Sequence, residues 1–139
     1  MIAVDVVEVA RKLVHVGADY LAVAFPSEGI ALREAGLEIP ILVFQSQPMH
    51  HEALIAHKLE PSLFSEKSLR EFIKVAEKMS QSKYPVHIKF NTGLNRLGFS
   101  QKETRLVHEL LSGTESVRAV SFFSHLAASQ DWRQREFSL

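Results

Sequence analysis

The sequence lacks cysteine, a long apolar run and an excess of either charge, and each absence excludes a class of protein. Without cysteine, disulfide bonds and thiolate metal sites are excluded. Sixteen basic residues balance sixteen acidic ones and are scattered along the chain, so we expect neither nucleic acid nor an anionic membrane as partner. No apolar run approaches the roughly 20 residues that span a bilayer, and the N-terminus lacks the basic start and apolar stretch of a signal peptide. We therefore expect a cytoplasmic protein.

What remains is the composition of a globular domain. The chain has 139 residues, of which 46% are hydrophobic, enough to bury a core in one domain of ordinary size. No linker rich in glycine or proline interrupts it. We expect residues 1–139 to belong to a single domain.

Hydrophobic periodicity predicts an alternation of helices and short strands. Apolar residues at helical spacing predict helices at 5–16, 27–35, 49–57, 65–80 and 100–112, with a last helix starting near Asp131. Short apolar runs at 20–24 and 41–44 are typical of strands covered on both faces. Further strands are predicted at 59–64, where Pro61 interrupts the pattern, at 86–90 and at 117–123. Local signals support several helix ends: Asp5 is a candidate N-cap, Ser100 and Glu103 match a capping box, and Gly17, Gly36 and Gly113 are stop signals.

This alternation predicts an α/β fold of about five parallel strands joined by right-handed crossovers. A closed barrel of eight βα units needs about 250 residues, so five strands make roughly half to two-thirds of one. An open doubly wound sheet is the alternative, and periodicity does not separate the two. Because the chain begins on a helix and ends inside another, we expect a fragment.

The most informative segment is 86–99, where the best predicted strand runs into a turn. It reads V-H-I-K-F-N-T-G-L-N-R-L-G-F, so the strand delivers two cations, Lys89 and Arg96, beside the same turn. Functional groups of parallel α/β folds lie at the carboxyl ends of strands. We therefore expect these cations to share one rim with His125, which follows the next strand.

The residue types suggest different roles. Arg96 carries a fixed fork of donors and never loses its proton, which suits holding a phenolate or carboxylate oxygen. Lys89 alternates with His87 and Asn91, so these three side chains share one strand face. A buried lysine needs a partner or must lose its charge. No metal site is predicted, because adjacent His50 and His51 point apart on any regular element.

Two strings of the sequence together resemble the alanine racemase family. The first, H-I-K-F-N-T-G-L-N-R-L-G-F at 87–99, is similar to the fifth barrel strand of that family, and F-S-H-L-A-A-S at 123–129 is the second. A looser match, D-Y-L-A-V-A-F-P-S-E-G-I-A-L-R-E-A-G at 19–36, resembles the segment after the cofactor lysine. The resemblance covers essentially the whole chain. It implies a partial TIM (β/α)8 barrel, strands two to six of eight, with pyridoxal 5'-phosphate (PLP) as cofactor.

The resemblance also implies a role for each candidate site residue. Arg96 matches an arginine that donates to the phenolic oxygen of PLP, and His125 matches a histidine that orients a second arginine against the pyridine nitrogen. Lys89 matches a lysine that is carbamylated in many members, where the anion pairs with the arginine. Leu94 matches a position whose backbone amide contacts the substrate carboxylate. Asn91 departs from the usual aspartate of the family, and Leu94 from the usual methionine.

The implied activity is the interconversion of L- and D-alanine, which supplies D-alanine for peptidoglycan. In the family, a Schiff-base lysine in a V-K-A-x-x-Y-G-type strand and a tyrosine base of the C-terminal domain move the protons. Neither occurs in this chain, so no catalytic residue is assigned. Two other functions stay open: a barrel-only PLP-binding protein of cofactor homeostasis, and a noncatalytic truncated product whose strand edges drive association.

Self-association follows from an incomplete barrel. Five parallel strands leave two edges and much of an apolar face unpaired, and covering a few hundred Å² at about 25 cal/mol per Å² contributes several kcal/mol. We expect light scattering to show a homo-oligomer, a dimer or larger. A stable monomer at tens of micromolar would instead support the open sheet.

The purified 139-residue chain is expected not to racemise alanine, because no residue matches the Schiff-base lysine. Incubation with PLP and L-alanine, followed by chiral chromatography, measures any D-alanine formed. D-alanine that disappears when the chain is removed would show that the lysine has been missed.

Overall fold

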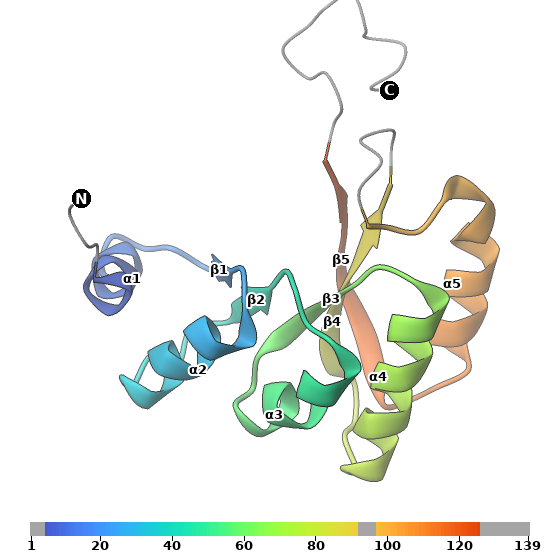
Figure 1. Ribbon diagram of the computed structural model, residues 1–139, viewed down its shortest axis with the longest axis horizontal. Helices are drawn as coiled ribbons and strands as arrows, with labels where there is room; N and C mark the ends of the chain where they lie inside the picture. The colour runs from blue at the N-terminus through green and yellow to red at the C-terminus, as the bar shows by residue number, and fades with distance from the viewer. Residues whose placement is uncertain (1–4, 92–96, 126–139) are drawn as a thin grey trace, which may run out of the picture. The chain divides into compact units, whose positions relative to one another are not determined.

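The computed structural model describes residues 5–91 and 97–125, shown as ribbon in Figure 1. The chain divides into two compact units, Met1–Ser62 and Leu63–Leu139. Each unit combines parallel strands with helices, as the predicted α/β class requires.

The first unit alternates helices with short parallel strands. Strand β1 pairs with β2 from Leu21↔Ile41 to Val23↔Val43, and β2 pairs with β3 through Leu42↔Glu60 and Val43↔Pro61. Its elements are α1 (Val6–His15), β1 (Leu21–Val23), α2 (Pro26–Glu34), β2 (Ile41–Val43), η1 (Pro48–His50), α3 (His51–Ala56) and β3 (Glu60–Leu63), whose last residue belongs to the second unit.

Local capping explains where the helices of this unit begin and end. The Asp5 carboxylate accepts hydrogen bonds from the backbone N–H groups of Val7 and Glu8 at 3.0 and 3.3 Å, which satisfies donors that a helix start leaves open. Gly17 and Gly36 have φ values of +97° and +89° after α1 and α2. These left-handed conformations favour glycine and confirm both residues as helix stops.

The core of the first unit comes from alternate strand residues and from one face of each helix. Leu21 and Val23 are buried on β1, whereas Ala22 between them is exposed. Burying such side chains is the main favourable contribution to folding. The buried apolar cluster consists of Ala10, Leu21, Val23, Leu32, Leu37, Ile41, Val43, Leu54 and Leu59.

Arg33 ties two loops of this unit to the end of α2. Its guanidinium donates hydrogen bonds of 2.7–2.9 Å to four backbone carbonyls, those of Leu37, Ile39, His57 and Lys58. A planar fork of donors is suited to such a task, because it binds several oxygens in one fixed geometry. The L-R-E-A-G string of the sequence therefore has a structural role in the fold.

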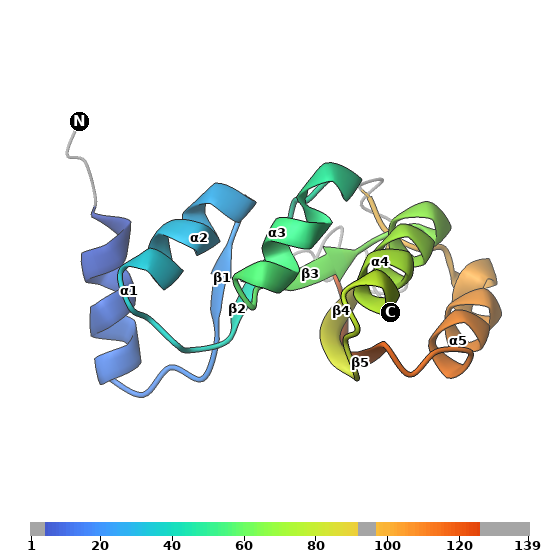
Figure 2. The ribbon, with the colours of Figure 1, turned by 90° about the horizontal axis from the view of Figure 1, so that it is seen from below.

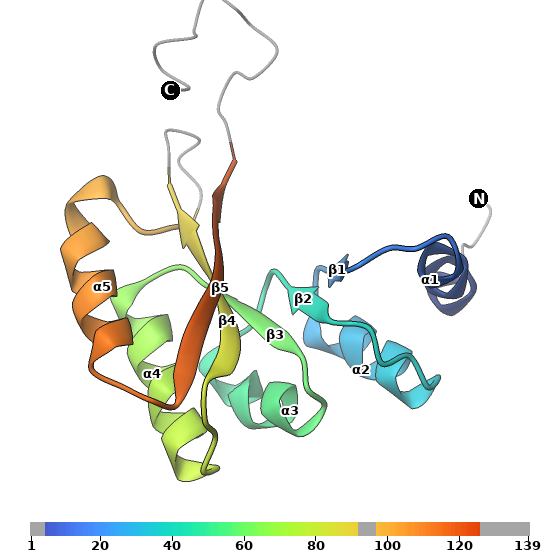
Figure 3. The same cartoon turned by 180° about the vertical axis from the view of Figure 1, so that it is seen from behind.

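In the second unit two helices lie side by side along one face of a strand pair, as Figures 2 and 3 show. Strands β4 and β5 are parallel, from Tyr84↔Val117 to Phe90↔Ser124. Its elements after β3 are α4 (Glu66–Lys78), β4 (Tyr84–Phe90), η2 (Gln101–Glu103), α5 (Thr104–Ser112) and β5 (Val117–Ser124).

Helix α4 shows why this packing forms. Leu69, Phe72 and Ala76 recur at helical spacing and are fully buried. The ring of Phe72 lies 5.7 Å from that of Tyr84, centroid to centroid, so α4 covers the start of β4. The helix begins at Ser65, whose side chain accepts from the Ser68 N–H at 3.1 Å.

The predicted elements agree with the structure except at some ends. All five predicted strands are present. They include β3, although Pro61 interrupts its strand pattern in the sequence. The predicted helix at 49–57 begins as the 3-10 turn η1, so its α-helical part is only His51–Ala56. The helix predicted at 100–112 differs in the same way. The predicted capping contact is present, because Glu103 accepts from the Ser100 N–H at 2.7 Å, but the 3-10 turn η2 comes first and α5 begins only at Thr104. The helix predicted near Asp131 lies outside the described residues. Within the described ranges, every helix is too short or too polar to span a bilayer.

Replacing Arg33 with methionine should lower the free energy of unfolding by about 2 kcal/mol or more, because carbonyls bound to a charged donor lose it. Arg11→Met is the matched control, since within the described part of the chain Arg11 donates a single hydrogen bond, to the Ala35 carbonyl at 2.8 Å, in an exposed position. Urea denaturation followed by circular dichroism measures both. Equal losses in the two variants would contradict the structural role of Arg33.

Candidate functional site

Lys89 and His125 lie at the same end of the β4–β5 strand pair. Lys89 is the partner of Phe123 in the parallel register, and His125 directly follows β5. Lys89 is half-buried and His125 is exposed. The carboxyl edge of two neighbouring strands therefore presents an ammonium and an imidazole, at the place where α/β folds bind ligands.

Two predicted site residues, Arg96 and Leu94, lie outside the described residues. The structure describes the chain on both sides of them, up to Asn91 and again from Leu97. Their roles at the cofactor and the substrate stay predictions, as do the cofactor role of His125 and the carbamylation of Lys89.

The chain returns to β4 directly after this segment. The Phe99 N–H donates to the Lys89 carbonyl, and the Asn91 N–H donates to the Phe99 carbonyl, both at 2.8 Å. These bonds form a parallel bridge between Phe90 and Phe99. Both ends of the segment that contains Arg96 are thus held at the carboxyl end of β4.

Gly98 allows this return. A Cβ atom at this position would lie 2.6 Å from the Asn91 nitrogen and 2.7 Å from the Phe90 carbonyl carbon. Backbone atoms cannot yield to such a contact, so only glycine lets the two segments approach so closely. The glycine of the R-L-G-F string therefore has a steric cause.

The two faces of the β4–β5 pair differ in chemistry. On one face the His87 Nδ1 lies 2.6 Å from the Ser121 hydroxyl, and His87 is only 4% exposed. Alternation places Lys89 on the same face as His87. On the opposite face the Phe90 ring lies 6.0 Å from that of Phe99 and 6.3 Å from that of Phe122. The expected orientation of Lys89, away from Phe90, agrees with these contacts.

An apolar groove of about 380 Å³ lies on the face that carries Phe90 and Phe122. Its lining combines the two strands with α5, and the residues are Phe90, Thr104, Val107, His108, Leu111 and Phe122. Because the strand faces alternate, this groove opens away from Lys89. It is therefore separate from the candidate site.

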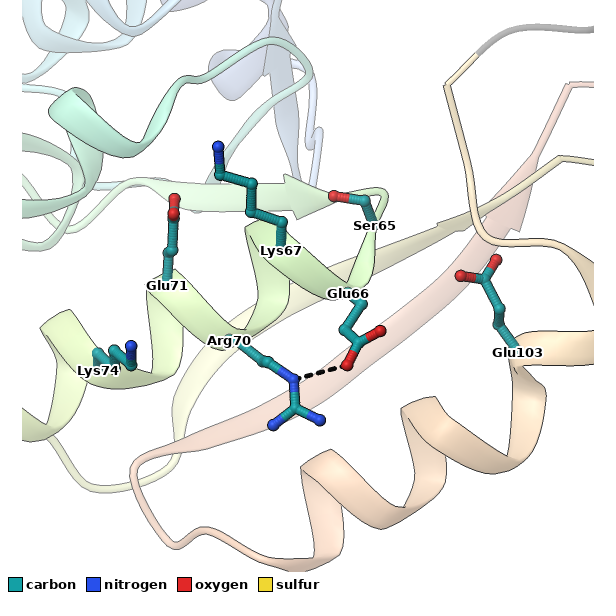
Figure 4. Close-up of a pocket in the computed structure, with 7 residues that line it drawn as sticks. All are labelled: Ser65, Glu66, Lys67, Arg70, Glu71, Lys74 and Glu103. Carbon is teal, nitrogen blue, oxygen red and sulfur yellow. Dashed lines mark hydrogen bonds and ion pairs between the residues drawn. The ribbon is translucent and has the colours of Figure 1, made fainter.

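A second groove, of about 580 Å³, follows the exposed side of α4 (Figure 4). Three acidic and three basic side chains line it together with Ser65: Glu66, Glu71, Glu103, Lys67, Arg70 and Lys74. Arg70 pairs with Glu66 at 2.8 Å, one turn away on the helix. The balanced charges select no ligand of either sign, and exposed pairs of this kind contribute little to stability.

The histidines outside the candidate site form no metal centre within residues 5–91 and 97–125, where no group of three or more potential ligands is found. His50 Nδ1 accepts from the Gln47 N–H at 3.1 Å, whereas His51 is buried at 1% exposure. The two adjacent histidines thus lie in different environments.

Sequence reasoning missed the His87–Ser121 pair. It placed His87 on the same strand face as Lys89, but it supplied no partner for the imidazole. The pairing depends on an irregular register between β4 and β5, which shifts between Val86 and His87. Alternation within one strand carries no information about such a shift.

Comparisons with known proteins cover the site and the rest of the chain. The family model described as "Alanine racemase, N-terminal domain" matches residues 3–138. An alanine racemase of Synechocystis is 36% identical over 127 residues, which cover 90% of this chain and 34% of that protein. The chain thus spans about a third of the length of the curated relatives it matches.

Solved structures give the same result for the fold. An alanine racemase of Clostridium difficile 630 superposes with a TM-score of 0.84 at 30% identity, covering 93% of this chain and 34% of that one. An alanine racemase of Bacillus anthracis with bound L-Ala-P gives 0.80 at 30% identity, covering 96% and 34%. These matches decide between the two predicted architectures, since the strands correspond to part of the barrel domain of these enzymes and not to an open doubly wound sheet.

Gly98→Ala should lower the free energy of unfolding by about 1–3 kcal/mol, because the added Cβ overpacks against backbone atoms. It should also remove the protection of the Phe99 and Asn91 amides from hydrogen exchange, measured by NMR. Gly113→Ala is the control, since its Cβ would meet the carbonyl oxygens of Glu109 and Leu110 at 3.2 and 3.8 Å, well beyond the 2.6 Å contact at Gly98. Unchanged protection in Gly98→Ala would contradict the close approach.

Proposed function

We propose that this chain, which belongs to the family of the alanine racemase N-terminal domain, is part of the cofactor-binding barrel of an alanine racemase. One observation carries the proposal. The family match at 3–138 runs through the whole of the segment 86–99 and through His125, and of these candidate residues the described ones, Lys89 and His125, lie at one carboxyl edge of β4 and β5. Residues 1–139 are all proposed to belong to that barrel domain.

The described residues of this edge fit an anionic aromatic cofactor. Lys89 and His125 can both donate hydrogen bonds to oxygen atoms, and they come from neighbouring strands at the ligand-binding end of the fold. Neither side chain is closed off from a ligand, because Lys89 is half-buried and His125 is exposed. PLP, with its phenolic oxygen and phosphate, has matching acceptors.

When bound, PLP supplies an electron sink that stabilises the carbanion left when Cα of alanine loses its proton. The residues of this chain hold and orient the reacting groups. Arg96 donates to the phenolic oxygen, and His125 orients an arginine contributed from outside this sequence. The backbone N–H of Leu94 binds the carboxylate of alanine.

Lys89 serves Arg96 in this proposal. Two cations at one strand end repel each other, and the repulsion grows where solvent is excluded. The neutral Lys89 amine would add carbon dioxide and release a proton to solvent, so that a carbamate anion replaces the like-charge pair with an ion pair. Arg96 is then held in one orientation towards the cofactor.

The complete protein needs parts that this sequence does not contain. These are the lysine that holds the cofactor and the tyrosine that moves the second proton, so the isolated chain is proposed to be inactive. The T-G-L-N-R-L-G-F string and the racemase relatives favour this enzyme over a barrel-only PLP-binding protein. The homo-oligomeric state and the cytoplasmic location stay predictions.

A chimera tests the proposal. The matching third of the Synechocystis alanine racemase is replaced with this chain, so that the host contributes the missing lysine and tyrosine. We expect the purified chimera to bind PLP and to racemise L-alanine. Arg96→Ala in the chimera should lower kcat by about a hundredfold, as expected for removal of one donor at the reacting centre.

Arg105→Ala is the matched control, because Arg105 lies exposed on α5, where its guanidinium pairs with Glu109 one turn along the helix. Its chimera should keep full activity. Equal activity of the Arg96 and Arg105 variants, both loaded with PLP, would refute the role of Arg96. In the same chimera, isotope-labelled bicarbonate should give a carbamate NMR signal that Lys89→Arg removes.

A further inference from the structure

We propose that a β-bulge at Val120, held by the hydrogen bond between His87 and Ser121, positions His125 on the strand face that carries Lys89. The importance of that face rests on the proposed function. The position of His125 does not depend on the proposed function, and it is tested in the absence of cofactor and without an activity measurement.

The bulge is visible in the pairing of β4 with β5. Val86 pairs with Ala119, but the next residue of β4, His87, pairs with Ser121. Val120 is therefore an extra residue on β5 with no partner of its own in this register. Bulges are rare between parallel strands, and they are found next to active sites, where they redirect a side chain.

The extra residue decides which way the end of β5 faces. Laterally paired residues of neighbouring strands point to the same side of the sheet. Beyond the bulge, Phe123 pairs with Lys89, and continuing the register by two residues aligns His125 with Asn91. His125 then shares the face of Lys89.

A regular strand would give the opposite result. Without the bulge, Val120 would pair with His87 and Ser121 with Ile88, because a shift of one residue turns every later side chain to the other face. His125 would then follow the face of Phe90, where the apolar groove lies. The same sequence would thus have its imidazole on the wrong side of the strand pair.

The His87–Ser121 hydrogen bond distinguishes the two registers. Ser121 is the first paired residue after the bulge, and its hydroxyl lies 2.6 Å from His87 Nδ1. His87 is 4% exposed, so losing the bond would cost a buried imidazole one of its hydrogen bonds. In the regular register Ser121 would lie on the face opposite to His87. His87 and Ser121 are therefore positioning residues, and neither needs to touch the cofactor.

Two substitutions of similar shape test the role of the hydroxyl. Ser121→Thr keeps the hydroxyl, whereas Ser121→Val removes it. In the isotope-labelled 139-residue chain, NMR should show nuclear Overhauser contacts between the His125 ring and the Asn91 side chain in the wild type and in Ser121→Thr. In Ser121→Val the ratio of the bulged to the regular register should fall roughly fivefold or more, the factor expected for loss of one hydrogen bond, so these contacts should weaken and contacts with the Phe90 ring should appear.

Deletion of Val120 supplies the rescue. Without that residue, Ser121 follows Ala119 directly, so the observed pairing beyond Val86 needs no bulge. The deletion alone should leave the contacts between His125 and Asn91 in place. Added to Ser121→Val, it should restore them, which a general loss of stability in Ser121→Val would not predict.

Each outcome decides the proposal. Dispersed amide spectra first establish that a variant is folded. Three results would overturn the proposal. The contacts between His125 and Asn91 could be absent from the wild type, or they could be retained at full strength in folded Ser121→Val. They could also be lost in the folded deletion variant. If Ser121→Val does not fold, folding of the double variant with its contacts intact supports the proposal, and failure of the double variant as well overturns it.

Discussion

The candidate site depends on the close approach of two backbone segments at the carboxyl end of β4. The chain leaves the strand at Asn91 and comes back at Phe99, where two hydrogen bonds of 2.8 Å hold it. Gly98 makes this possible, because any side chain there would overlap the backbone of the strand. The described residues on either side of the segment with Arg96 are thus held together at the edge that presents Lys89.

The alternation of faces along β4 separates chemistry from packing. His87 and Lys89 lie on one face, whereas Ile88 and Phe90 lie on the other, Ile88 fully buried and Phe90 against aromatic rings. A strand covered on both sides can hold polar groups in this way only if they find partners there. His87 does so through Ser121 on β5, and the partner is available because the bulge turns the serine to that face.

The predicted elements were recovered where the local signal was strong and independent of other elements. Asp5, Gly17 and Gly36 mark helix ends through capping and left-handed backbone, which involve only neighbouring residues. Element ends were less accurate near Pro48 and Ser100, where 3-10 turns precede the helices. The sequence placed Arg33 in a family-like string but indicated no structural role for its side chain. Its four carbonyl partners lie in two loops, one of them more than twenty residues away along the chain.

The α/β class, the order of the strands and helices, and the family resemblance of the segment 86–99 could all be predicted from the sequence, because they depend on periodicity and on contiguous residues. Two contacts could not be predicted and became visible in the folded chain: Gly98 packs against Phe90 and Asn91, and Ser121 rather than Val120 faces His87. Both are contacts between separate segments of backbone. Their geometry depends on strand register, which periodicity within a single strand does not specify.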